Sequence, residues 1–327
     1  MEMLACAAIE RVGKDSPAHA VASDPYLFSM IASFLVKRKK KAHLILSQLE
    51  TFLSAIFSFD IRSMELSASG LLSIGYRPRR IHCAGVLVKK KQVYTFDDIY
   101  RVTLERERVA IGGLMEWIDV IDKLRGYDHL AARLTAEGKI ECLCMTSTFD
   151  GYYHLVSFDP ETKAWSDPRR IGWDLEPYRN SDFIMNSRWI VYRQDRRRIA
   201  YRRRGLNACM GQEATVSLGA YPDDRLIIGD VLWMVYRREI CIVLQSYSMT
   251  QRCSLNADGY LEFKIPRTAR ILAVASVRIF IVFFFLNSPP FVFDTEEGVG
   301  MFQGEKTVAQ LLRTDVRNTT EWRVAVE

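Results

Sequence analysis

The stretch YYHLVSFDPETKAW, residues 152–165, is the strongest indication of the fold, because its pattern recurs along the rest of the chain. Three later stretches also place an aromatic residue in an apolar strand: RRRIAYRRRG (196–205), ICIVLQSYSM (240–249) and PPFVFDTEEG (289–298). The aromatic residues Phe158, Tyr201, Tyr247 and Phe293 are spaced 43, 46 and 46 residues apart. A period in the forties is typical of four-stranded units packed in series, of which β-propeller blades are the commonest. The pattern therefore predicts a β-propeller that binds partners through its loops.

A continuous apolar run precedes each of these aromatic strands. The runs are IECLCM (140–145), RWIVYR (188–193), VLWMVYR (231–237) and IFIVFFF (279–285). Inner propeller strands are buried on both faces, so they carry apolar residues at consecutive positions. At about 45 residues per unit, residues 137–327 accommodate about four blades.

Composition limits the class of protein. The 327 residues are 49% hydrophobic and 26% charged, which supports a packed core. The net charge of +6 is too mild for a dedicated nucleic-acid binder. The most apolar run, residues 271–286, contains Arg278, so we expect no membrane span. The seven cysteines are an odd number without metal-ligand spacing, which predicts reduced thiols and a cytoplasmic location, with the nucleus as the alternative.

The sequence shows no catalytic constellation. Its five histidines are scattered, and H-E-x-x-H, G-x-S-x-G and P-loop motifs are absent from the sequence. We therefore predict a protein that is not an enzyme and that uses no cofactor and no metal.

The N-terminal part suggests a strand, a basic turn and a helix. Leu46, Leu49, Leu53 and Phe57 fit one helical face. Phe34-Leu35-Val36, Ala42-His43, Leu44-Ile45-Leu46 and the stretch 52–57 (FLSAIF) follow the order found in BTB (POZ) domains, so residues 24–69 resemble a partial BTB domain. An F-box is the competing interpretation, based on Pro25, Met30-Ile31 and Phe34-Leu35, but the expected Trp-bearing closing helix is absent from the sequence.

A second helical pattern lies in residues 100–135. Apolar stripes comprise Val109, Leu114, Trp117, Ile118, Ile121 and Leu124, and then Leu130 and Leu134. Together with Glu107, Arg125 and His129, they resemble the end of a BACK domain, the helical connector of BTB–kelch proteins. The resemblance implies helices in residues 70–99 as well, whereas the stretch VLVKKKQVYTF (86–96) favours a hairpin, and both interpretations stay open.

The propeller part resembles the kelch repeat. In FDPETKAW (158–165), an aspartate and a proline start a turn, and a tryptophan follows seven residues after the phenylalanine. Phe293-Asp294-Thr295 repeats the start of this motif, and Thr320-Glu321-Trp322 repeats its end, although the kelch double glycine is missing. The predicted fold is thus multidomain: an extension (1–23), an α+β BTB-like part (24–69), a short α-helical BACK-like connector (70–136) and an all-β kelch-type propeller with few blades (137–327).

This resemblance implies a substrate-recognition adaptor of a cullin-RING ubiquitin ligase. The BTB part would form a homodimer and bind the cullin through Phe57, Ile61, Arg62 and Ser63, while the propeller would bind the protein to be ubiquitylated. Cullin-binding members carry a hydrophobic-x-Glu element where this chain has Ile61-Arg62-Ser63. That departure favours the alternative, a non-catalytic interaction scaffold for cytoskeletal or other proteins, or a competitor of true adaptors, without cullin binding.

Two loop regions are the predicted partner-binding sites of the propeller. The first is a long aromatic loop that contains Trp173, Tyr178 and Arg179. The second is the basic run of Arg196, Arg197 and Arg198, whose guanidinium groups can bind carboxylate or phosphate in a bidentate manner. The alternative interpretation of the run is a solvated hairpin tip without a partner.

Overall fold

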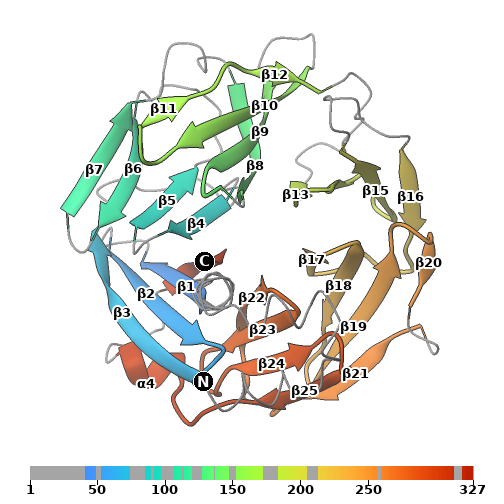
Figure 1. The fold of residues 1–327 in the computed structure, drawn as a ribbon. Helices are drawn as coiled ribbons and strands as arrows, with labels where there is room; N and C mark the ends of the chain where they lie inside the picture. Colours follow the sequence, from blue (N-terminus) through green and yellow to red (C-terminus); the bar gives the residue numbers. More distant parts are fainter. Residues whose placement is uncertain are drawn as a thin grey trace, which may run out of the picture. The chain divides into compact units, whose positions relative to one another are not determined.

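The structure is a computed structural model that describes residues 41–48, 53–73, 85–89, 92–96, 106–111, 114–119, 127–135, 137–146, 152–171, 183–204, 213–255, 259–312 and 319–326. Within these residues it contains twenty-six strands and one short helix, α4 (Val308–Leu312) (Figure 1). The described chain is therefore all-β. The predicted extension 1–23 and the remaining BTB-like residues up to 40 lie outside the described residues.

The strands form five sheets, and the largest has eight strands in the order β3-β2-β1-β26-β4-β5-β6-β7. This sheet holds two four-stranded units, which are joined by a short parallel pairing of β26 with β4. Unit 1 comprises β26 (Thr319–Val326), β1 (Lys41–Gln48), β2 (Leu53–Asp60) and β3 (Glu65–Ser73). Unit 2 comprises β4 (Gly85–Lys89), β5 (Gln92–Phe96), β6 (Arg106–Ile111) and β7 (Leu114–Asp119).

Each of the other four sheets is one antiparallel unit. Unit 3 comprises β8 (Tyr127–Leu134), β9 (Ile140–Thr146), β10 (Tyr153–Asp159), β11 (Ala164–Trp165) and β12 (Arg169–Arg170). Unit 4 comprises β13 (Phe183–Met185), β14 (Trp189–Arg193), β15 (Arg198–Arg203) and β16 (Ala214–Ser217). Unit 5 comprises β17 (Asp224–Ile228), β18 (Val231–Arg237), β19 (Cys241–Ser248), β20 (Cys253–Ser254) and β21 (Leu261–Lys264). Unit 6 comprises β22 (Ile271–Val277), β23 (Phe280–Phe285), β24 (Phe291–Asp294) and β25 (Val299–Phe302).

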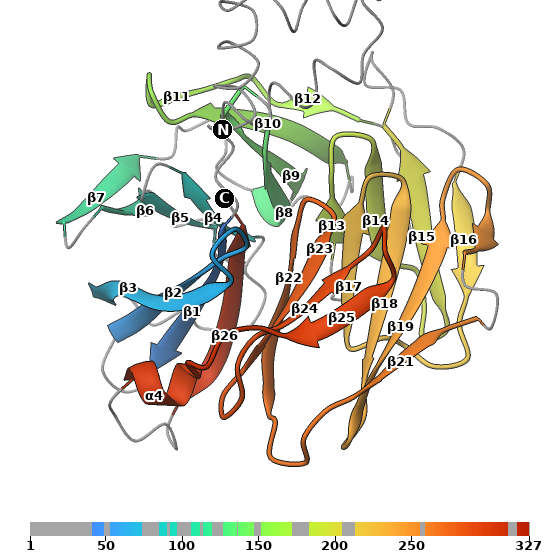
Figure 2. The ribbon, with the colours of Figure 1, turned by 60° about the horizontal axis from the view of Figure 1, so that its bottom comes forward.

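The innermost strands of the units meet in a closed ring. Contacts run from β26 to β4, β8, β13, β17 and β22, and from β22 back to β26 (Figure 1). The C-terminal strand β26 lies beside the N-terminal strand β1, as Figure 2 shows. The two strands pair antiparallel, with Ala42 opposite Val326 and Leu46 opposite Trp322. One unit therefore contains both ends of the described chain, and this pairing closes the β-propeller without an open edge between first and last units.

The predicted BTB-like helix over residues 42–57 is wrong, because its described residues lie in the two paired strands β1 and β2. Strands β1 and β2 pair in register, with Ala42 opposite Phe59 and Leu46 opposite Ala55. Ala42 and Leu44 are both fully buried, and so are Phe57 and Phe59, at the alternate positions that a strand directs to one face. Apolar residues occupy so many positions in this stretch that they satisfy a helical stripe as well as a strand alternation.

The predicted helical BACK-like connector is also wrong. Residues 106–111 and 114–119 form the paired strands β6 and β7, in which Ile111 lies opposite Leu114, and Gly112-Gly113 stand between them in the sequence. Glycine is a poor helix former and a preferred residue of two-residue hairpin turns, so this pair is the local signal for strands. Residues 127–134, the second predicted stripe, form the inner strand β8. For residues 86–96 the hairpin interpretation is confirmed by β4 and β5.

The aromatic rhythm is confirmed as the repeat of the propeller. Phe158, Tyr201, Tyr247 and Phe293 lie in the third strand of units 3, 4, 5 and 6, respectively. Tyr201 lies 6.0 Å from Tyr247 between ring centroids, so the anchors of units 4 and 5 contact each other. Phe293 lies 5.4 Å from Trp233 of the preceding unit. Three of the four anchors therefore contact a neighbouring unit, whereas the ring of Phe158 contacts Trp165 of its own unit at 4.9 Å.

The rhythm extends into the N-terminal part, where it was not predicted. Phe59-Asp60 ends the third strand of unit 1, at the place that Phe158-Asp159 and Phe293-Asp294 occupy in units 3 and 6. Phe59 is fully buried with Phe57, Leu44 and Ala42 in a core that includes residues of unit 6. Burial of a side chain of this size contributes about 1.5–3 kcal/mol. The described residues of the stretch that resembled a BTB domain therefore belong to one more propeller unit.

Candidate interaction surface

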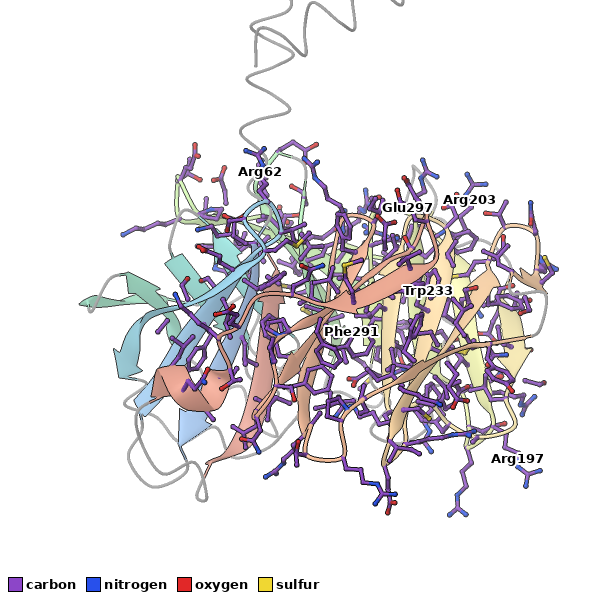
Figure 3. All side chains as sticks on the ribbon, turned by 90° about the horizontal axis from the view of Figure 1, so that it is seen from below. Arg62, Arg197, Arg203, Trp233, Phe291 and Glu297 are labelled. Atoms are coloured by element: carbon purple, nitrogen blue, oxygen red, sulfur yellow. The ribbon has the colours of Figure 1, made fainter. Side chains whose placement is uncertain are left out.

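The propeller has two faces, because alternate turns of each antiparallel unit lie at opposite ends of its strands. Figure 3 places Arg62, Arg203 and Glu297 at one edge of the ring and Arg197 at the opposite edge. Arg62 and Glu297 lie in turns between third and fourth strands, whereas Arg197 precedes the third strand of unit 4. The strands of these units thus run in the same sense, and corresponding turns share a face.

We name the two faces by their residues. The turn face consists of the described turns 61–64, 135–139 without residue 136, 160–163, 186–188, 229–230, 249–252, 278–279 and 295–298, the strand residues that adjoin them, and Arg203 at the end of β15. The arginine face consists of the described turns 194–197, 238–240 and 286–290, the connections 218–223 and 265–270, and the strand residues that adjoin them.

The hairpin between β14 and β15 is the centre of the arginine face. Asp195 organises its tip: one carboxylate oxygen accepts the Arg197 backbone N–H at 2.7 Å, and the other accepts Arg198 Nε at 2.5 Å. Both hydrogen bonds lower the pKa of Asp195 and keep its carboxylate ionised, and the bond from the Arg197 backbone N–H has the larger effect. Because Asp195 fixes the backbone and pairs with Arg198, the side chains of Arg196 and Arg197 remain exposed at the tip.

A hollow adjoins this tip on the side of β16. It has a volume of about 690 Å³ and is lined by Asp195, Arg196, Arg197, Arg198, Ser217 and Leu218. The Leu218 N–H donates to the Arg197 carbonyl at 2.7 Å, so the main chain fixes the apolar side chain beside the guanidinium groups. The hollow therefore offers cations, one hydroxyl group and an apolar contact within a single surface depression.

Tyr221 supports the same region from the connection between units 4 and 5. The Arg193 guanidinium lies 4.1 Å from the centroid of the Tyr221 ring, and that of Arg225 lies 5.4 Å from it. Arg193 Nε also donates to the Asp195 carbonyl at 3.2 Å. These cation–π contacts and the hydrogen bond tie the hairpin to the connection, so its exposed arginines extend from a fixed base.

Units 5 and 6 continue the arginine face. The turn after β18 exposes Arg238, Glu239 and Ile240, and its backbone is closed by the Arg238 N–H, which donates to the Cys241 carbonyl at 2.9 Å. The connection to unit 6 exposes Arg267 and Arg270. Cations thus recur on three consecutive units of the ring.

The two faces differ in charge balance. The described arginine face exposes seven cationic side chains, Arg196, Arg197, Arg198, Arg238, Lys264, Arg267 and Arg270, against two anionic ones, Asp223 and Glu239. The described turn face exposes seven cationic side chains, Arg62, Lys139, Lys163, Arg188, Arg203, Arg252 and Arg278, against five anionic ones, Glu65, Glu137, Glu161, Glu296 and Glu297. The arginine face therefore has the stronger positive field, which attracts acidic partners.

The turn face is built from tight turns instead. Seven of its turns place a residue in the left-handed region: Met64, Gly138, Lys163, Gly229, Arg252, Arg278 and Gly298. No residue of the arginine face as defined above has such a φ; Gly259 and Gly304, with φ 80° and 75°, lie outside both sets of residues. In three of these turns an aspartate caps the backbone, as when Asp294 accepts the N–H groups of Glu296 and Glu297 at 2.9 and 3.2 Å. Asp60 and Asp159 do the same in units 1 and 3.

Polar contacts between units also lie toward the turn face. Glu141 of unit 3 accepts Arg204 Nη2 of unit 4 at 2.7 Å and Arg133 Nε at 2.6 Å, and all three side chains are largely buried. Burial by itself raises the pKa of Glu141, but Arg204 and Arg133 outweigh it, so the pKa lies below its ordinary value near 4.5. In the same way, Asp230 of unit 5 accepts Trp189 Nε1 of unit 4 at 2.8 Å. This face thus joins the units together.

The structure separates the residues predicted as sites. Phe57 and Ile61 are buried in the core, whereas Arg62 and Ser63 are exposed in the β2–β3 turn of the turn face. Arg196, Arg197 and Arg198 are exposed on the arginine face. Trp173, Tyr178 and Arg179 lie outside the described residues. The exposed members of the predicted cullin-facing set therefore lie on the face opposite to Arg196, Arg197 and Arg198, as the positions of Arg62 and Arg197 in Figure 3 show.

Several residues of the arginine face were not predicted. Arg238, Ile240, Arg267 and Arg270 lie far from the hairpin in sequence, and only the closed ring brings their turns to one end of the strands. Their signal is positional. Arg238 and Ile240 follow the second strand of unit 5, and Arg267 and Arg270 precede the first strand of unit 6. Numbering the turns within each repeat would therefore have placed all four residues at the same end of the strands.

The described part of the chain contains no group of three or more His, Cys, Asp or Glu side chains that could hold a metal ion. Three of the described cysteines, Cys142, Cys144 and Cys241, are buried, and Cys253 is exposed. Among the described residues, the helix α4 has five residues, which is too short for a membrane span.

No family model matches the chain, and no curated protein matches it. Among solved structures, a protein of unknown function from Bacteroides caccae has 10% identity and a TM-score of 0.49, with 87% of this chain and 98% of that one covered. TolB from Acinetobacter baumannii has 11% identity and a TM-score of 0.45, with 95% and 73% covered. Apo AztD from Citrobacter koseri has 6% identity and a TM-score of 0.45, with 88% and 98% covered. At these identities and scores the matches carry no conclusion about function.

The predicted membership of the BTB–BACK–kelch group is wrong. Strands occupy the described parts of the predicted BTB-like and BACK-like regions, and no family model matches the chain. The all-β propeller itself stands on the strand order and the closed ring.

Proposed function

We propose that this protein is a non-catalytic β-propeller that binds a protein partner through its arginine face. The observation that carries the proposal is the excess of seven exposed cations over two anions on one face of the described propeller. A rigid ring that presents turns from several units at one end is a suitable platform for recognising another protein. The cation-rich turns adjoin apolar side chains, which suits a protein–protein contact.

The adaptor form of this function depended on the BTB-like part, which the hairpin of β1 and β2 replaces. Two of the four residues expected to bind the cullin, Phe57 and Ile61, are core residues here. What we propose is therefore the scaffold alternative, a protein-binding propeller without cullin binding.

Site-specific photo-cross-linking in the cells that make the protein tests this function. A photo-reactive residue replaces Ser217 on the arginine face and, as the matched control, Ser63 on the turn face, because both serines are exposed. We expect a discrete protein adduct from position 217 and none from position 63. Equal adducts from both positions, or no protein adduct at all, would contradict the proposal.

A further inference from the structure

The exposed cations of the arginine face are mostly arginines presented by fixed backbone. Asp195 holds the hairpin tip, and the stack of Arg193 on Tyr221 holds its base. A planar guanidinium fork matches a carboxylate in bidentate geometry, and a fixed backbone lowers the entropy lost when such a pair forms. The ligand chemistry that suits these groups is a series of carboxylates.

Apolar side chains lie between the cations. Leu218 lines the hollow beside Arg196–Arg198, and Ile240 is 48% exposed next to Arg238 and Glu239. Ile240 thus adds an exposed apolar side chain to a turn whose other exposed side chains are charged. A ligand that fits both features carries apolar side chains between its acidic ones.

These features favour a protein segment over a nucleic acid. Single-stranded nucleic acids bind to aromatic rings on which bases stack, but the ring of Tyr221 is covered by Arg193 at 4.1 Å. Asp223 and Glu239 are exposed on the same face, and they would repel a continuous line of phosphates. Scattered carboxylates can avoid these two positions, whereas a phosphate backbone cannot.

We infer that the arginine face binds an acidic segment of a partner protein in which apolar residues are interspersed with Asp and Glu. The segment crosses from the hollow of unit 4 to the turn after β18 in unit 5 and the connection that contains Arg267 and Arg270. This inference rests on the proposed function, and it adds the chemistry of the partner.

The test measures binding of the full chain to three labelled probes by fluorescence anisotropy. The probes are a peptide of Glu-Leu-Asp-Gly repeats, the same peptide with Lys in place of each acid, and single-stranded DNA of similar charge. The variant Arg196→Glu/Arg197→Glu changes the arginine face, and Arg62→Glu/Arg203→Glu is the matched control on the turn face. A third variant, Ile240→Ser, removes the apolar contact and keeps the charge. Thermal unfolding confirms that every variant is folded.

We expect the wild type to bind the acidic peptide more tightly than the other two probes. The arginine-face variant should weaken this binding about tenfold or more, and the turn-face control less than about twofold. Ile240→Ser should weaken it by a smaller factor of about two to five, and added salt should weaken it in every protein that binds.

Four outcomes would overturn the inference: no binding of the acidic peptide by the wild type, equal loss in both charge-reversal variants, tighter binding of DNA than of peptide, or no loss with Ile240→Ser. The cross-linking result separates this inference from the proposed function. An adduct at position 217 without acidic-peptide binding means that the face binds a partner of other chemistry. Absence of both means that the proposed function fails too.

Discussion

The two faces of the propeller are built by different rules, although the same strands support them. The turn face consists of tight turns with left-handed residues and aspartate caps, and buried ion pairs join the units there. The described arginine face has no left-handed residue, and its exposed cations outnumber its anions by seven to two. The capped turns and buried ion pairs that stabilise the propeller thus lie at one end of its strands, and the exposed cations that we propose bind a partner lie at the other end.

The largest loss of stability should follow Glu141→Gln. The substitution leaves the guanidinium groups of Arg133 and Arg204 buried without their carboxylate, and breaking such a buried pair costs about 3 kcal/mol or more. Urea unfolding measures the difference in the free energy of unfolding. A loss below about 1 kcal/mol would show that the contact between units 3 and 4 does not stabilise the ring.

Acid should remove part of the same stability. Because the folded-state pKa of Glu141 lies below its ordinary value near 4.5, its contribution is fully present above that pH. It is lost as the pH falls through the lowered folded-state pKa. The stability difference between the wild type and Glu141→Gln should therefore shrink below about pH 4.5. A difference that stays constant between pH 7 and pH 3, measured by thermal unfolding, would contradict this assignment.

The aspartate cap of unit 6 should matter less than the buried ion pair. Asp294→Ala removes the acceptor of two backbone N–H groups in an exposed turn, and we expect a loss of about 1–2 kcal/mol. Glu239→Ala on the arginine face is the control, with an expected change within about 0.5 kcal/mol. Equal effects of the two substitutions would remove this difference between the faces.

Two glycines offer a direct comparison of the backbones. Gly298 on the turn face has φ 71°, whereas Gly219 on the arginine face lies outside the left-handed region, and a Cβ at either position would meet nothing within 4 Å. Gly298→Ala should cost about 1 kcal/mol because the backbone conformation is unfavourable for alanine. Gly219→Ala should be neutral or stabilise by about 0.5 kcal/mol, since it restricts the unfolded chain. Melting temperatures that shift in the same direction would contradict the comparison.

The smallest effect on stability should come from the proposed binding residues. Arg197→Ala removes an exposed side chain at the hairpin tip, and its effect on the free energy of unfolding should stay within about 0.5 kcal/mol. Binding of the acidic peptide should nevertheless weaken measurably. A destabilisation above 1 kcal/mol in denaturant unfolding would indicate a structural role of this arginine.

The propeller could be predicted from the sequence because its anchors are local. Phe158, Tyr201, Tyr247 and Phe293 recur once per unit, and each follows a continuous apolar run. These runs were expected to be the inner strands, but the structure places them as the second strand of units 3 to 6. The N-terminal units were missed because β1 and β2 are apolar at positions that fit both periods. The Gly112-Gly113 connection carried the signal for strands, but a family resemblance outweighed it.

The candidate site was only partly predictable. Arg196, Arg197 and Arg198 are adjacent in sequence, so their charge was visible as a run. Arg238 lies in one turn and Arg267 and Arg270 lie in a later connection, so only their positions within the repeat relate them to the hairpin. Closure by β26 was equally hidden, because the pairing of β26 with β1 joins residues almost a full chain length apart.

The second and third strands of units 3 to 6, their aromatic anchors and the arginine hairpin could be read from the sequence alone, because these features depend on residues a few positions apart. Only the tertiary structure decided that the N-terminal region belongs to the ring and that one face gathers the cations. These properties depend on which strands pair over long separations and on the common direction of the units around the ring. Such pairings form because whole sheets bury their apolar faces against one another. Short stretches of sequence therefore do not predict which distant strands pair.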